Sequence, residues 1–214
     1  TVNSPTALKF GYVGKPLFNV KIKIASDGEI LAKGPNIMTG YYKNEDATKE
    51  VFDSEGWFKT GDIGYLDDDN FLKITDRKKS LIVTSAGKNI APAPIEIKLT
   101  SSLYIEQVHI IGDRRNYLTA IIVPNIDSIK SYLSKININI SDINSIIGNE
   151  EVVSLFTKEI DSAMVDFARS EKVKKFTLIA EPFSIEKGEM TPKMSIVRKV
   201  VENNYSEIIN GMYN

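Results

Sequence analysis

The sequence predicts an α+β fold in two parts, a β-rich first part and a second part in which strands and helices alternate. Up to Asp76, short apolar runs are separated by turns rich in Gly, Pro, Asp and Asn. Beyond it, apolar runs of strand length alternate with segments of helical period. Residues 1–76 hold nine Lys, no Arg and twelve acidic residues, whereas the rest has a slight basic excess. We therefore expect two domains, 1–76 and 77–214.

Short strands and tight turns are expected in the first part. Apolar side chains alternate with lysines over residues 20–24, which is typical of a half-buried strand. Asp27-Gly28 predicts a tight turn that leads into a returning strand at 29–33. Further along we expect a short helix at 44–51, short strands at 57–58 and 71–74, and a turn at 67–70.

Mixed strands and helices are expected in the second part. Val152, Phe156 and Ile160 recur at helical spacing, so residues 149–169 form the clearest predicted helix. Helices are also expected at 92–103 and 197–212, a loop with a short helix at 136–147, and strands at 81–83, 89–91, 108–111, 118–123 and 176–179.

The composition excludes several classes of function. The net charge of −1 argues against a general nucleic-acid binder, and no apolar run approaches the roughly 18 residues of a membrane span. Cysteine is absent, and the one histidine, His109, lies in an apolar run and is interpreted as a strand residue, so no metal site is expected. The chain opens without Met or a leader and is expected to be a piece of a longer polypeptide.

Three segments carry side chains suited to a nucleotide. Asp62 lies between two glycines and suits a ribose diol, although such an Asp equally often caps its own turn. The basic residues at 77–79 suit phosphates, although a charge run is usually solvated surface. The Gly/Pro loop at 188–199 holds a lysine that could reach a phosphate oxygen. The alternative interpretation is a surface lysine before a helix.

Taken in order, four blocks resemble the C-terminal third of the adenylate-forming superfamily, which includes acyl-CoA synthetases, luciferases and peptide-synthetase adenylation domains. Among these, the blocks are most similar to those of bacterial long-chain fatty acyl-CoA ligases. The blocks are the Gly-Glu to Gly-Tyr-Tyr stretch at 28–42, Thr-Gly-Asp at 60–62, the hinge block at 76–82 with 87–92, and the final loop at 188–198.

The resemblance implies a fold and site residues. Residues 1–76 would end the large AMP-binding domain, and residues 77–214 would be a small mobile cap with mixed sheets flanked by helices. ATP, CoA and Mg²⁺ are the implied cofactors, with the Mg²⁺ site upstream of this chain. The implied roles are ATP or AMP binding for Asp62 and Arg77, the hinge for Asp76 and Lys79, and CoA binding for Gly87 and Lys88.

The sequence departs from the family pattern at the final loop. Alignment of Thr191 and Arg198 puts Ser195 where the family has its adenylation lysine. Lys193 lies two residues earlier, and in an extended loop it would point to the same side. Lys193 is therefore the tentative catalytic residue.

The expected function is that of a fragment of a long-chain fatty acid–CoA ligase, inactive alone because the phosphate loop and acyl pocket lie upstream. A non-catalytic cap that binds a nucleotide or a partner is one alternative, and an adenylation domain that loads a carrier protein is another. Fatty acid, ATP, CoA and the upstream domain are the expected partners. The expected location is cytoplasmic, with peripheral contact at the inner face of the membrane left open.

Overall fold

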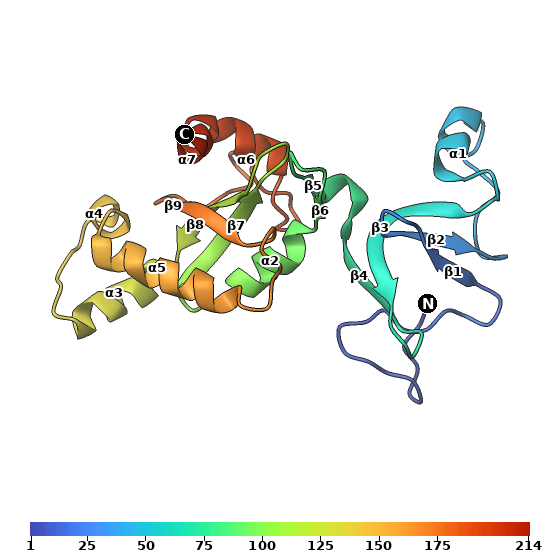
Figure 1. Cartoon of the computed structure of the whole chain (residues 1–214), viewed down its shortest axis with the longest axis horizontal. Helices are drawn as coiled ribbons and strands as arrows, with labels where there is room; N and C mark the ends of the chain where they lie inside the picture. Colours follow the sequence, from blue (N-terminus) through green and yellow to red (C-terminus); the bar gives the residue numbers. More distant parts are fainter. The chain divides into compact units, whose positions relative to one another are not determined.

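The computed structural model describes all 214 residues, which form two compact units, Thr1–Leu81 and Ile82–Asn214. Figure 1 shows the elements of each unit in the colours of the sequence. The first unit runs five residues beyond the boundary predicted at Asp76, because the short helix that follows packs on a strand of the same unit. The mixture of sheets and helices confirms the predicted α+β class.

The first unit is built on a four-stranded antiparallel sheet in the order β1-β2-β3-β4. Asn44 caps the only α-helix of this unit by accepting a hydrogen bond from the Ala47 N–H, as expected. The elements are β1 (Lys21–Ile24), β2 (Glu29–Lys33), α1 (Glu45–Val51), β3 (Phe58–Leu66), β4 (Leu72–Arg77) and the 3₁₀ helix η1 (Lys78–Ser80).

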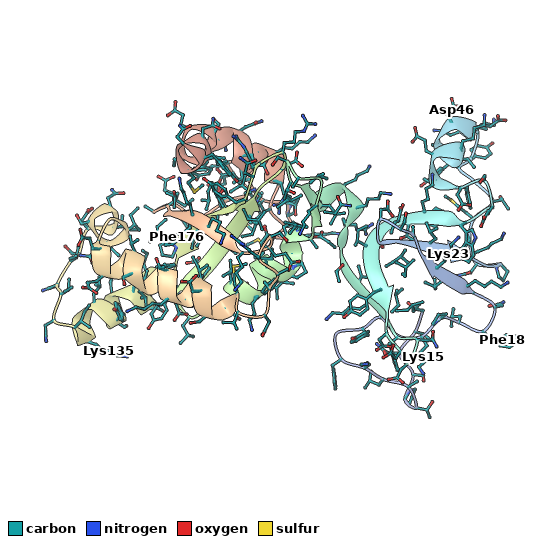
Figure 2. The ribbon with its side chains drawn as sticks, in the orientation of Figure 1. Lys15, Phe18, Lys23, Asp46, Lys135 and Phe176 are labelled. Atoms are coloured by element: carbon teal, nitrogen blue, oxygen red, sulfur yellow. The ribbon has the colours of Figure 1, made fainter.

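Large apolar side chains lie exposed on the first unit. Phe18, labelled in Figure 2, is fully exposed, and Phe10 is 91% exposed.

The second unit holds a three-stranded sheet in the order β7-β8-β9, in which β7 and β8 are antiparallel and β9 is parallel to β8. A separate two-stranded ladder, β5-β6, precedes it. The elements are β5 (Ile82–Val83), β6 (Asn89–Ile90), α2 (Pro92–Leu99), β7 (Ile105–Ile111), β8 (Leu118–Pro124), α3 (Ile126–Lys135), α4 (Ile143–Ile147), α5 (Glu150–Ala163), β9 (Val173–Leu178), α6 (Arg198–Asn204) and α7 (Ser206–Tyr213).

Both faces of the three-stranded sheet are covered by helices. Alternate residues of β8 point to opposite faces, so Ala120 and Ile122 join the cluster with α2, α3, α4 and α5. Ile121 and Val123 join a second cluster with α6 and α7. All seven residues of β8 are therefore buried.

Several predicted bounds were wrong. The helix from Pro92 ends at Leu99, because the Thr100 and Ser101 hydroxyls hydrogen-bond back to carbonyls of its last turn. The helix expected to reach residue 169 ends at Ala163, and the closing helix is broken at Tyr205 into α6 and α7. Helix α3 was not expected. No helix is long and apolar enough to cross a bilayer.

Candidate functional site

Asp62 and Arg77 lie directly opposite each other on β3 and β4. Arg77 Nε is 2.9 Å from Asp62 Oδ1, and the Arg77 side chain is 70% exposed against 21% for Asp62. The second carboxylate oxygen of Asp62 makes no hydrogen bond. The structure thus brings together the two residues predicted to bind the nucleotide, and it leaves one acceptor oxygen and one exposed guanidinium.

Asp62 stands in a bulge of β3. Leu31 pairs with Lys59 and Glu29 pairs with Ile63, so three residues of β3 lie opposite one residue of β2. Gly61 has φ +73°, a left-handed conformation that favours glycine. The Asp62 N–H donates to the Thr60 hydroxyl at 3.1 Å. The bulge therefore takes Asp62 out of the β2–β3 ladder, while Asp62 still pairs with Arg77 of β4.

Sequence reasoning missed the buried carboxylate beneath this bulge. Glu29 is 5% exposed, and its Oε1 accepts a hydrogen bond from the Gly61 N–H at 3.0 Å. Its Oε2 lies 2.7 Å from the Lys78 ammonium, which is also 2.6 Å from Asp27 Oδ2. Hydrogen bonds from Lys78 to these two carboxylates raise its pKa above 10.5, so it stays charged.

The predicted hinge residues flank this lysine. Asp76 pairs with Ile63 of β3, and its Oδ1 accepts a hydrogen bond from the Arg77 N–H at 2.6 Å. Lys79 is the middle residue of η1 and is exposed.

In the second unit, Gly87 and Lys88 close a loop between β5 and β6. The Gly87 N–H donates to the Thr84 carbonyl at 2.9 Å, and Gly87 has φ +74°. The Ser85 N–H donates to the Arg115 carbonyl, which ties the loop to the turn between β7 and β8. The loop is thus held in one conformation that requires a glycine.

A basic pocket of about 390 Å³ adjoins this loop. Four cationic side chains and no acidic one line it. Lys172 directly precedes β9 and Lys174 lies within it, and this spacing of two is a sequence signal that could have indicated the pocket. The lining residues are Thr84, Ala86, Lys88, Asn116, Tyr117, Arg169, Ser170, Lys172 and Lys174.

Lys193 and Ser195 lie exposed on a tight turn. The Met194 N–H donates to the Thr191 carbonyl, the Thr191 N–H donates to the Ser195 carbonyl, and Met194 has φ +61°. The loop is a turn and not extended, so the argument from an extended loop does not apply to Lys193. Lys193 as a substitute for the missing lysine stays a prediction.

Two acids, the buried Glu189 and the partly buried Glu96, hold the segment that carries this turn. Glu189 is 1% exposed and accepts from the Asn204 side-chain amide at 3.0 Å. Glu96 Oε1 accepts from Arg198 Nη1 at 2.9 Å and from the Ile110 N–H at 3.0 Å, and Arg198 also donates to the Ile110 carbonyl. The turn is therefore anchored on both sides to the body of the second unit.

His109 lies on β7, as expected, and is fully buried. Its Nε2 is 3.4 Å from Glu202 and its Nδ1 is 3.8 Å from Glu96, but neither nitrogen has a well-formed hydrogen bond. Burial lowers the pKa of His109 below 6.5 more than the two carboxylates raise it. The imidazole is therefore neutral at pH 7.

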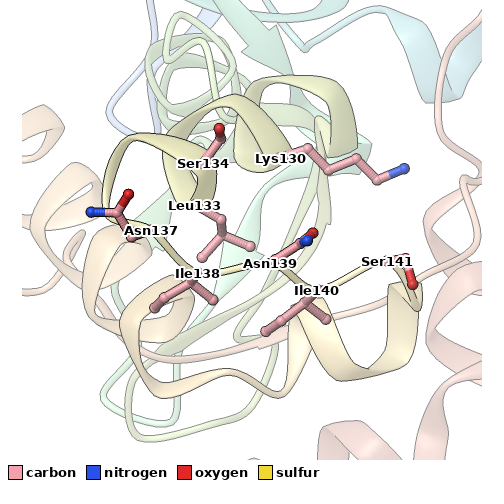
Figure 3. A pocket seen from close by; sticks show the side chains of 8 residues that line it. All are labelled: Lys130, Leu133, Ser134, Asn137, Ile138, Asn139, Ile140 and Ser141. Carbon is pink, nitrogen blue, oxygen red and sulfur yellow. The ribbon is translucent and has the colours of Figure 1, made fainter.

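A further pocket of about 580 Å³ involves none of the predicted site residues. Figure 3 shows it around the end of α3 and the segment that follows, lined by Lys130, Leu133, Ser134, Asn137, Ile138, Asn139, Ile140 and Ser141. No group of three or more His, Asp or Glu side chains is placed to hold a metal ion.

Solved structures place this fold in a class, the C-terminal part of adenylate-forming enzymes. The adenylation domain of carboxylic acid reductase from Segniliparus rugosus, solved with AMP and a co-purified carboxylic acid, is 25% identical with a TM-score of 0.71, over 94% of this chain and 32% of that one. The O-succinylbenzoate CoA synthetase of Bacillus subtilis, solved with ATP and a magnesium ion, is 29% identical with a TM-score of 0.59, over 89% and 35%. Residues 79–214 match the AMP-binding enzyme C-terminal domain, and the chain belongs to this family.

Curated relatives match nearly the whole chain. The long-chain-fatty-acid–CoA ligase FadD15 of Mycobacterium tuberculosis is 37% identical over 97% of this chain and 34% of that protein. The long-chain-fatty-acid–CoA ligase ACSBG1 of Rattus norvegicus is 31% identical over 99% and 33%. The chain spans about a third of the length of these relatives. The resemblance stated from the four sequence blocks is confirmed.

Proposed function

We propose that this chain is the C-terminal part of an ATP-dependent long-chain fatty acid–CoA ligase. In the first step, a carboxylate oxygen of the fatty acid attacks the α-phosphorus of ATP, which gives acyl-AMP and releases pyrophosphate. In the second, the CoA thiolate attacks the acyl carbon and AMP leaves. Similarity to long-chain ligases over nearly the whole chain supports this choice of substrate.

The observation that carries the proposal is the pairing of Asp62 with Arg77. The carboxylate keeps one oxygen able to accept from ribose hydroxyls, and Arg77 holds the other at 2.9 Å. Because the guanidinium is largely exposed, it retains donors for a second, anionic group. A carboxylate and a guanidinium in this order suit the ribose and phosphate of one nucleotide.

For the second step, we propose that the cap turns about Lys79 and presents the Gly87 loop to the pantetheine of CoA. The basic pocket beside Lys88 then takes the phosphates of CoA, because four cations without an acid form a strong anion site. The cytoplasmic location and the peripheral contact with the membrane stay predictions.

Magnesium would be held by the upstream domain, since no acidic cluster of this chain suits it. We also propose that this domain covers the exposed apolar side chains of the first unit, such as Phe10 and Phe18.

The proposal is tested on the full-length protein with palmitate, ATP and CoA, following acyl-AMP and thioester separately. Both products are expected, and Asp62→Asn should lower both. Asp46→Asn, an exposed acid on α1 of the same unit, is the matched control and should change neither. If neither product forms across a panel of carboxylates, the ligase proposal fails.

Ser195 favours a second candidate, a non-catalytic cap that binds nucleotide. Loss of one cation aimed at developing negative charge costs about 10²–10³ in rate. Acyl-AMP formation by the full-length protein separates the two candidates, and Lys193→Ala in that protein then tests the role of this lysine. A large fall in acyl-AMP formation supports Lys193 as the substitute, and an unchanged rate removes it from the mechanism. An adenylation domain that loads a carrier protein is distinguished by acyl transfer to a carrier instead of CoA.

A further inference from the structure

The bulge that carries Asp62 leaves a backbone donor without a partner in the sheet. Three residues of β3 lie opposite Ile30 alone, so the β2–β3 ladder cannot supply an acceptor for the Gly61 N–H. A side chain supplies it instead, the carboxylate of Glu29 at 3.0 Å. The conformation of the residue directly before Asp62 is thus set by a buried acid.

A buried carboxylate is stable only when its charge is compensated. Lys78 provides the compensation at 2.7 Å and also reaches Asp27 at 2.6 Å. Arg77, its neighbour in sequence, holds Asp62 from the other side of the same bulge. Two consecutive cations therefore fix both sides of the bulge, and both lie directly before Lys79.

We propose that Glu29 is a positioning residue that fixes the Gly61–Asp62 backbone for ribose binding, and that the ion pair with Lys78 holds the Glu29 side chain in place. The inference rests on the proposed nucleotide role of Asp62. Glu29 touches no substrate and acts through the Gly61 N–H. Because Lys78 is joined to Lys79, the same ion pair fixes the starting point of the proposed hinge.

The test measures ATP binding to the full-length protein by calorimetry, together with the melting temperature of each variant. Glu29→Ala should weaken ATP binding about tenfold, the usual scale for one lost hydrogen bond to a charged group. Glu29→Gln keeps an acceptor for the Gly61 N–H and should bind ATP within about threefold of the wild type. Asp27→Asn keeps the Gly61 bond and one Lys78 partner and should bind ATP like the wild type.

The outcomes separate the inference from the proposed function. If Asp62→Asn binds ATP normally, both the proposed nucleotide role of Asp62 and the inference about Glu29 are overturned. Asp62→Asn that binds weakly, with Glu29→Ala that binds normally while melting at a lower temperature, overturns the inference alone, because Glu29 is then only structural. If Glu29→Ala does not fold, Glu29→Asp replaces it. This variant keeps the charge but shortens the side chain, and normal ATP binding by it likewise overturns the inference.

Discussion

Replacement of Glu96 by Ala should destabilise the second unit more than most single changes. Glu96 accepts hydrogen bonds from Arg198 and from the Ile110 N–H, and it lies 3.8 Å from His109. The carboxylate and the guanidinium are each about one-fifth exposed. Removal of the acid leaves the mostly buried Arg198 without its carboxylate partner and the Ile110 N–H without an acceptor.

The expected loss is about 3 kcal/mol. A broken buried pair costs about 3–5 kcal/mol, and partial exposure of both partners lowers this to about 2–4. The unpaired Ile110 N–H adds to this loss within the same range. With a urea slope near 2 kcal/mol/M, the unfolding midpoint should fall by about 1.5 M.

Tryptophan fluorescence and far-ultraviolet circular dichroism report the unfolding of the two units separately. Trp57 is the only tryptophan and lies in the first unit, whereas six of the seven α-helices lie in the second. Far-ultraviolet circular dichroism in urea should therefore report the Glu96→Ala shift. Glu96→Gln keeps an acceptor for the Ile110 N–H and should shift it about half as far. An unchanged dichroism midpoint in Glu96→Ala would refute the argument that this pair anchors the loop.

Three further predictions concern pH and the two loops of the second unit. Burial lowers the pKa of His109 below 6.5 against the pull of Glu96 and Glu202, with a nearby guanidinium of α6 adding to the lowering. The unfolded chain then binds the proton more readily, so stability should fall as pH drops below about 6.5, by at most about 1.4 kcal/mol per pH unit. Melting curves from pH 7.5 to 5 check this, and His109→Asn should flatten the dependence. Ser195→Lys in the full-length protein should raise acyl-AMP formation by up to about 10²-fold if the family lysine is truly missing; a rate no higher than the wild type contradicts this. Lys172→Ala should raise the KM for CoA about tenfold and leave the KM for ATP unchanged; equal effects on both would argue against a CoA site.

Local sequence patterns predicted most elements of the fold. Alternation and turn residues predicted β1 and β2, and the apolar period of 152–160 predicted α5. Helix bounds were less accurate, since Thr100 ends α2 through its own side chain and Tyr205 interrupts an otherwise helical pattern. Capping and tertiary packing set where these helices end, and apolar periodicity alone does not predict them.

The site was predicted in part for a similar reason. Asp62 and Arg77 follow from short motifs, and the structure pairs them. Glu29 and Lys78 are 49 residues apart in sequence. Their contact depends on a bulge that no local sequence pattern predicts. The loop around Met194 was interpreted as extended, although Pro192 at the second position of the Thr191–Met194 turn is a turn signal.

The complete burial of β8 has a consequence for synthesis of the chain. Its antiparallel partner β7 is made just before it, but its parallel partner β9 follows only after residues 125–172. At about 5–20 residues per second, translation of that crossover takes several seconds. During this time a strand of mostly Leu, Ile and Val has one open edge, which is the form most prone to pair with another chain. Nascent chains halted before β9 should therefore aggregate or recruit chaperones more than the whole chain of 214 residues.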